Sequence, residues 1–123
     1  MPKLSPRPID PENMNYFLDD LWSAITTLSS KDQIKFFLKE LLTHTEQKML
    51  AKRFQSALML VAGYNYQTIK KHLKVSEQTI ARMANQLSER GQTIAKTAQE
   101  IIRIKAHKLE KQRHPKNTIT PAI

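Results

Sequence analysis

Cysteine is absent from the 123 residues of this chain, and glycine occurs only twice. Without cysteine the chain forms neither a disulfide nor a cysteine-ligated zinc site, which fits a reducing compartment. The longest uninterrupted apolar run, residues 57–62, is far shorter than the roughly 20 residues that a membrane-spanning helix requires. The N-terminus also has no apolar core of the kind found in signal peptides. We therefore expect a cytoplasmic protein without a membrane partner.

Strand-like alternation is also nearly lacking, whereas apolar residues at spacings of three and four recur along most of the chain. The expected fold class is therefore all-α. The chain has the length of one domain and is large enough to bury a core. We expect residues 11–114 to form a single all-helical domain, between an extended proline-rich arm at residues 1–10 and a flexible tail at residues 115–123.

The net charge of +9 is unevenly distributed. Residues 1–42 hold five Lys or Arg and six Asp or Glu, which gives a net charge of −1. Residues 43–123 hold fifteen and five, which gives +10. This asymmetry indicates that the first part packs or assembles while the second meets a polyanion. Nucleic acid is the favoured polyanion, ahead of an anionic membrane.

Start signals divide the chain into six predicted helices. The first is expected to begin at Asp10, a cap that precedes a proline and an acid. Capping-box spacing joins Ser30 to Gln33 and Thr43 to Glu46, and so predicts the starts of the second and third helices. The third helix is expected to end at the glycine at position 63, two helices follow from residue 66, and after a break at residues 88–91 the last helix begins near residue 92.

The first three helices and the last carry rich apolar stripes. The predicted inward positions are Met14, Phe17, Leu18, Leu21, Trp22, Ile25 and Leu28 in the first helix, Ile34, Phe37, Leu38 and Leu41 in the second, Leu50, Phe54, Ala57, Leu58 and Val61 in the third, and Ile94, Ala98, Ile101, Ile102 and Leu109 in the last. A monomer of this size is not expected to cover all four stripes. The pattern therefore favours a homodimer.

Residues 65–87 have the pattern of a helix-turn-helix. A first helix is expected at residues 66–73, and Ser76 is placed to cap a second helix at about residues 76–87. The apolar contact between the two helices is predicted from Ile69, Leu73, Val75 and Ile80. This contact leaves on the outer faces of the second helix Glu77, Gln78, Thr79, Ala81, Arg82 and Asn85. A short helix with small polar residues outward suits insertion into the major groove of duplex DNA.

Each outward side chain suggests a specific contact with DNA. Gln78 is the main candidate for base reading because an amide can pair bidentately with adenine. Thr79 suits a thymine methyl group or a phosphate, and Arg82 suits guanine, phosphate or an effector. Glu77 either accepts a hydrogen bond from cytosine or favours the positive end of the helix dipole. Phosphate contacts that add affinity without reading sequence are predicted for Lys70, Lys71 and Lys74.

Residues 42–87 resemble the tryptophan repressor family, in particular its tryptophan-repressor-like branch in bacteria. The shared features are a Leu-Thr-x-x-Glu helix start, an arginine deep in the long helix, a closing glycine and a Thr-Ile-x-Arg motif, carried here by Leu42, Thr43, Glu46, Arg53, Gly63, Thr79, Ile80 and Arg82. Their order and spacing agree, apart from an apparent one-residue deletion near residues 64–66. The resemblance implies an intertwined all-helical homodimer that binds palindromic duplex DNA operators as a transcriptional repressor.

Carried over to this sequence, the resemblance places Gln67 and Lys70 of the first helix of the motif, and the start of the recognition helix, on the DNA. The full set of predicted DNA contacts is Gln67, Lys70, Lys71, Lys74, Ser76, Glu77, Gln78, Thr79 and Arg82.

The family also implies an effector site between the long helix and the recognition helix, where the best-known member binds tryptophan. Thr43, Arg53 and Arg82 fall on positions that line this site. Met83, however, stands where the site has a glycine, and Gln86 where it has a serine. Because a methionine there would fill the space that the indole needs, the sequence argues against tryptophan as the corepressor, and no other cofactor is expected.

Other interpretations stay open. The same hairpin occurs in helical assembly or adaptor modules, in which it packs on a protein partner. The basic last helix, residues 96–113, suits contact with flanking DNA, with RNA or with an anionic membrane, and equally suits an ordinary solvated surface. No catalytic constellation and no metal-ligand spacing are found in the sequence, so neither an enzyme nor a metal site is expected.

Overall fold

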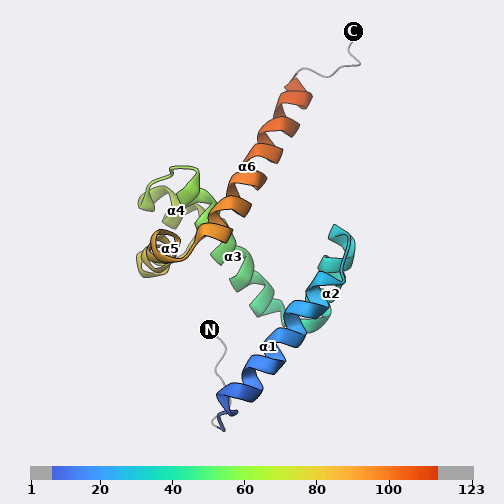
Figure 1. The fold of residues 1–123 in the computed structure, drawn as a ribbon. Helices are drawn as coiled ribbons and strands as arrows, with labels where there is room; N and C mark the ends of the chain where they lie inside the picture. Colours follow the sequence, from blue (N-terminus) through green and yellow to red (C-terminus); the bar gives the residue numbers. More distant parts are fainter. Residues whose placement is uncertain (1–6, 114–123) are drawn as a thin grey trace. The chain divides into compact units, whose positions relative to one another are not determined.

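A computed structural model describes residues 7–113, and this part of the chain contains six α-helices and no strand. The helices are α1 (Pro11–Thr26), α2 (Lys31–Leu41), α3 (His44–Val61), α4 (Tyr66–Leu73), α5 (Glu77–Glu89) and α6 (Gln92–Arg113) (Figure 1). The predicted all-α class and the six predicted helices are confirmed. The tail at residues 115–123 and most of the arm at residues 1–10 lie outside the described residues.

The chain divides into two compact units, residues 1–50 and residues 51–123. The border falls within α3, so the first unit contains α1, α2 and the start of α3, and the second contains the remainder. The expected single domain at residues 11–114 would require the two units to pack together as one body. It stays a prediction.

Local hydrogen bonds set the helix starts of the first unit. Asp10 caps α1 only through its backbone, because its carbonyl accepts from the Met14 amide at 3.0 Å while its carboxylate makes no capping hydrogen bond. Asp10 is thus the N-cap of α1, as predicted, but only its backbone makes the capping hydrogen bond. The proline that follows Asp10 lacks an amide hydrogen and fixes φ, which favours the helix start without that carboxylate.

The two predicted capping boxes are found, one in an altered form. Thr43 and Glu46 form the complete box: the Glu46 amide donates to Thr43 Oγ1 at 3.1 Å and the Thr43 amide donates to Glu46 Oε1 at 2.8 Å. At α2 the Gln33 amide donates to Ser30 Oγ at 3.1 Å, but Gln33 Oε1 accepts from the amide of Ser29 at 2.7 Å instead of that of Ser30.

Apolar side chains of the first unit remain open to solvent. Neither α1 nor α2 contains a buried residue. The exposed fractions of Phe17, Trp22 and Leu41 are 54%, 55% and 54%. Leu50, predicted as an inward residue of α3, is 50% exposed. In this single chain the stripes are therefore only partly covered, and Leu50 of α3, like Leu109 of α6 (57% exposed), is not buried within its own unit as predicted.

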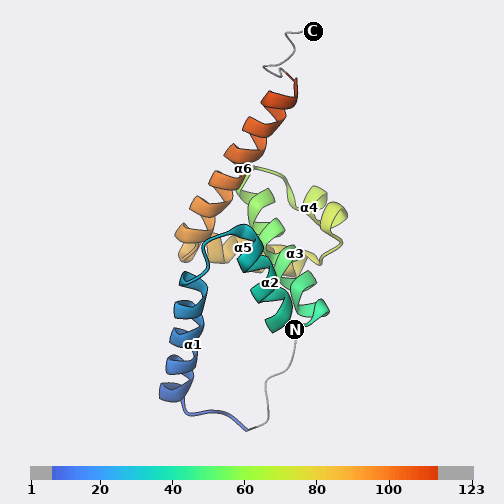
Figure 2. The same cartoon turned by 90° about the vertical axis from the view of Figure 1, so that its right-hand side faces the viewer.

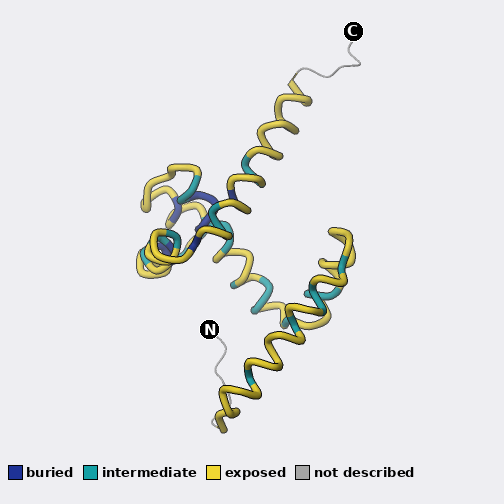
Figure 3. The backbone as a smooth tube through the Cα atoms, viewed as in Figure 1, coloured by how far each residue is buried: buried dark blue, intermediate teal, exposed yellow. Residues whose placement is uncertain are grey.

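The second unit contains all the fully buried residues of the described chain (Figure 3). Met59, Ile69 and Ile80 form its central cluster, against which pack Leu60, Leu73 and Val75. The predicted contact among the four residues of the helix-turn-helix is thus confirmed. Met59 and Leu60 were not predicted as inward residues. Both belong to the uninterrupted apolar run at residues 57–62, where every side of α3 is apolar and periodicity alone cannot show which side α4 and α5 cover.

Glycines shape two junctions of the second unit. Gly63 has φ +95°, and the Gly63 amide donates to the Leu60 carbonyl at 3.1 Å while the Tyr64 amide donates to the Met59 carbonyl at 3.0 Å. This Schellman arrangement ends α3 as predicted. Gly91 allows α6 to begin close to α5, since a Cβ atom there would lie 2.5 Å from Leu87 Cα.

Candidate nucleic-acid interface

The helix-turn-helix consists of α4, a three-residue turn and α5, close to the predicted residues 65–87. Asn65 Oδ1 accepts from the Thr68 amide at 2.9 Å and so caps α4, and Ser76 Oγ accepts from the Thr79 amide at 3.2 Å and caps α5. α5 continues to Glu89, so the predicted break at residues 88–91 begins two residues too early. Ser88 stays helical because its hydroxyl donates back to the Asn85 carbonyl at 3.0 Å.

The turn contains a lysine in a backbone conformation that favours glycine. Lys74 has φ 55° and ψ 50°, and it is the only non-glycine residue with positive φ among residues 7–113. Its amide donates to the Lys70 carbonyl at 2.9 Å and closes the last turn of α4. A left-handed conformation costs a residue with a Cβ atom roughly 1–2 kcal/mol. The sequence predicted a break here but not this geometry, because the usual signal for it is glycine or asparagine.

One face of α5 is anchored while the opposite face is open. Ile80 is fully buried and Met83 is 7% exposed, whereas Gln78, Thr79 and Arg82 are exposed. The inward position predicted for Ile80 is therefore confirmed, and the N-terminal polar residues of α5 face solvent, whereas Ala81, predicted on the outer face, is half-buried. Such a helix can contact a ligand through the exposed residues of its first turns while its buried side chains stay packed against the second unit.

All the predicted DNA contacts are exposed, and they lie on α4, the turn and the first turns of α5. They are Gln67, Lys70, Lys71, Lys74, Ser76, Glu77, Gln78, Thr79 and Arg82. The Ser76 hydroxyl is engaged in the cap of α5 and also lies 3.0 Å from Thr79 Oγ1. The structure thus gathers these residues on one helix-turn-helix, and their contact with DNA stays a prediction.

An ion pair links the two helices of the motif. Lys70 Nζ of α4 lies 3.8 Å from Glu77 Oε1, the first residue of α5. Both side chains are about half exposed, at 51% and 56%. Sequence reasoning assigned both residues to the DNA face but missed that they pair with each other. The sequence signal that could have predicted this pair is the opposite charge of two residues on either side of a short turn.

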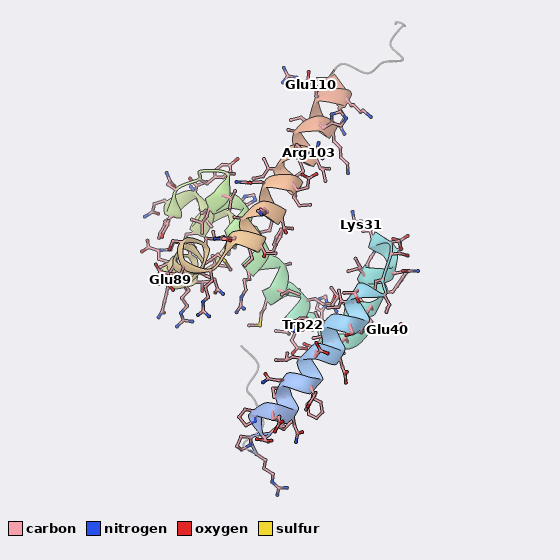
Figure 4. All side chains as sticks on the ribbon, in the orientation of Figure 1. Trp22, Lys31, Glu40, Glu89, Arg103 and Glu110 are labelled. Carbon is pink, nitrogen blue, oxygen red and sulfur yellow. The ribbon has the colours of Figure 1, made fainter. Side chains whose placement is uncertain are left out.

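The second half of α6 extends beyond the other helices of its unit (Figure 2). Residues 103–113 are all exposed, and they include Arg103, Lys105, Lys108, Lys111 and Arg113. Arg103 and Glu100 form an ion pair that raises the pKa of Arg103 and lowers that of Glu100. Arg103 and Glu110 mark this part of the helix in Figure 4. The interpretations of the basic surface given above, a nucleic-acid contact, an anionic-membrane contact and a solvated helix, all stay predictions.

The predicted effector residues belong to different units. Thr43 lies in the first unit, where its hydroxyl accepts a hydrogen bond in the capping box. Arg53 and Arg82 lie in the second unit, and both side chains are exposed. Met83 is buried, whereas Gln86 is exposed. An effector site built from these residues stays a prediction.

Comparison with models of known protein families shows to which family this chain belongs. A family model described as Trp repressor protein matches residues 16–101. The chain belongs to the tryptophan repressor family. The resemblance drawn from residues 42–87 is therefore confirmed, and the match extends it to α1, α2 and the first half of α6. No curated protein and no solved structure gave a match.

Membership of the tryptophan repressor family gives the chain its general role. The family is one of DNA-binding transcription regulators with a helix-turn-helix, and it is not a family of enzymes. The helices described at residues 11–113 include none that is both long and apolar enough to cross a membrane. Residues 102–113 of α6 lie outside the family match.

Proposed function

We propose that this member of the tryptophan repressor family is a dimeric repressor that binds duplex DNA sequence-specifically. The observation that carries the proposal is the anchoring of α5, whose buried Ile80 and Met83 leave Gln78 and Thr79 exposed at its start. A helix held in this way can enter the major groove with its N-terminal residues against base edges.

In this proposal the first turns of α5 read sequence. The Gln78 amide pairs with adenine through N6 and N7, which the major groove presents as a donor and an acceptor. Thr79 adds its methyl group against a thymine, since its hydroxyl is engaged with the cap residue Ser76. Arg82, about one turn further along α5, reaches a phosphate.

The lysines beside the turn supply affinity that does not depend on sequence. Lys70, Lys71 and Lys74 are exposed, and they stand at the end of α4 and in the turn. Each phosphate that a lysine neutralises releases a counterion, so binding weakens steeply as salt rises. Lys74 retains a strained backbone conformation at this place, which is consistent with a functional role of its side chain.

A dimer is supported by the apolar surface of the first unit. Phe17 and Trp22 on α1 and Leu41 on α2 are each more than half exposed in the single chain. Large apolar side chains left exposed on a helix that also carries an apolar stripe are typical of an interface between subunits. A two-fold dimer would place two copies of α5 about one DNA turn, ~34 Å, apart, and so favour a palindromic operator.

We also propose that tryptophan is not the corepressor. Met83 stands at the position of a pocket glycine, and its side chain is 7% exposed within the second unit. Tryptophan is therefore not expected to raise the melting temperature of the protein, whereas a ligand that binds the folded state would raise it.

Selection of bound sites from random duplex DNA tests the proposed function. The expected result is one palindromic site with half-sites about one helical turn apart. Gln78→Ala and Thr79→Ala together should erase the sequence preference and leave non-specific, salt-sensitive binding. A control variant near the far end of the same helix, Ser88→Ala, should keep the preference.

The competing function is a helical adaptor that docks on a protein. In that case affinity for duplex DNA is weak and no site emerges from the selection. Binding that shows no steep dependence on salt would contradict the regulator and favour the adaptor, because phosphate contacts necessarily release counterions.

A further inference from the structure

Within residues 65–87 Glu77 is the only acidic residue, and the next one, Glu89, is the last residue of α5. The basic residues of this range are Lys70, Lys71, Lys74 and Arg82. The side chain of Glu77 is 56% exposed, and it stands at the first position of α5, directly before Gln78. In a segment that is to approach phosphates, a carboxylate at this place repels DNA of any sequence. Its presence therefore needs a reason beyond affinity.

The carboxylate of Glu77 has a defined partner in the free protein. Glu77 Oε1 lies 3.8 Å from Lys70 Nζ, across the turn that separates α4 from α5. An ion pair as exposed as this one stabilises a protein only weakly, so it can open when either side chain finds a better partner. The pair neutralises one of the lysines expected at the DNA backbone.

We propose that Glu77 is a specificity-determining residue. On non-cognate DNA its carboxylate stays paired with Lys70 and keeps that lysine from the phosphates. At the cognate site the carboxylate leaves Lys70 and accepts a hydrogen bond from the exocyclic amino group of a cytosine. The inference rests on the proposed function of α5. Cytosine presents its N4 amino group in the major groove as a donor, and carboxylates accept from it. At the cognate site Lys70, released from Glu77, pairs with a phosphate.

The exchange distinguishes cognate from non-cognate DNA by weakening binding to non-cognate sites. At a site without cytosine in register, the carboxylate of Glu77 faces acceptor atoms such as guanine O6 or thymine O4 and finds no donor. Binding there either leaves a desolvated carboxylate without a partner or keeps the Lys70 pair closed and forgoes a phosphate contact. Both alternatives weaken non-cognate binding, which is how a repulsive group raises specificity.

Glu77→Gln in the full-length chain tests this inference against Glu89→Gln. Both substitutions remove one negative charge from an exposed glutamate of α5, but Glu89 is the last residue of the helix. The affinities of each variant for the selected operator and for an unrelated duplex of equal length are measured by fluorescence anisotropy at several salt concentrations. Circular dichroism confirms that the variants remain helical.

The ratio of operator to unrelated-duplex affinity is expected to fall roughly tenfold in Glu77→Gln. The neutral amide accepts from cytosine N4 less strongly than a carboxylate, can also donate to guanine O6 or thymine O4, and no longer repels other sequences. In Glu89→Gln both affinities rise by the same factor, so the ratio is kept. Repeating the site selection with Glu77→Gln should relax one position in each half-site, and that position should be a C·G pair in the wild-type site.

Two outcomes overturn the inference while the proposed function stands. One is an operator preference of Glu77→Gln equal to that of Glu89→Gln. The other is relaxation at a position that is not C·G. The proposed function itself fails in a different way, which is that the wild-type protein selects no site at all.

Discussion

Ile69 of α4 and Ile80 of α5 are both completely buried, and they belong to one cluster with Met59 of α3. This contact joins the two helices of the motif to the end of the long helix. It fixes the direction in which α5 presents its polar face. The stability of the second unit and the geometry of its candidate interface therefore depend on the same side chains.

Ile80→Ala is expected to lower the free energy of unfolding by about 2–5 kcal/mol, because truncation leaves a cavity in a fully packed cluster. Ile69→Ala should behave similarly. Urea denaturation followed by circular dichroism measures the change. Ile104→Ala is the control, since Ile104 is 36% exposed on α6 and its truncation should cost much less.

Lys74→Gly is expected to raise the free energy of unfolding by about 1 kcal/mol, because glycine adopts the left-handed conformation without the cost borne by a Cβ atom. Lys71→Gly, inside α4, should lower it by about 1 kcal/mol. If both lysines contact phosphates, each substitution should reduce the slope of log affinity against log salt by about 0.9. Equal destabilisation by the two glycines would contradict the strain assigned to Lys74.

The Thr43–Glu46 capping box predicts a dependence of stability on pH. The pKa of Glu46 is lowered by a hydrogen bond from the Thr43 amide and, to a smaller extent, by hydrogen bonding with the Thr43 side chain. Because the folded state favours the carboxylate, this contribution is fully present above the ordinary pKa of a glutamate. It is lost as pH falls through that value toward the lower folded pKa.

Glu46→Gln should therefore flatten the acid limb of the stability curve, measured by urea denaturation at a series of pH values. The matched control is Glu40→Gln, an exposed glutamate near the end of α2 without a role in a cap. An acid limb of unchanged steepness in Glu46→Gln would show that the box does not contribute.

Trp22→Glu is expected to disrupt the proposed dimer, because it places a charge within the exposed apolar stripe of α1. Light scattering after gel filtration should show a smaller species, and affinity for the operator should fall more than affinity for a single half-site. Tyr16→Glu is the control on the opposite side of α1, where the side chain is 64% exposed. A wild-type protein that is monomeric at micromolar concentration would contradict the dimer.

The sequence alone determined the helices, most of their ends and the family. The starts of α3 and α5 depend on hydrogen bonds between residues three positions apart, at Thr43 with Glu46 and at Ser76 with Thr79. Interactions of such short range depend only on neighbouring residues in the sequence, so the bounds of the helix-turn-helix could be predicted to within about two residues. The inward position of Ile80 in α5 followed from helical periodicity in the same way.

Only the tertiary structure decided which further side chains are covered and which charges meet. Met59 is buried within an apolar run whose pattern does not single out one side of α3, and Leu50 is exposed although the pattern included it. The pairing of Lys70 with Glu77 and the left-handed backbone of Lys74 likewise depend on how α4 and α5 are held against α3. Burial and ion pairing between helices are set by neighbours distant in sequence, which helical periodicity does not record.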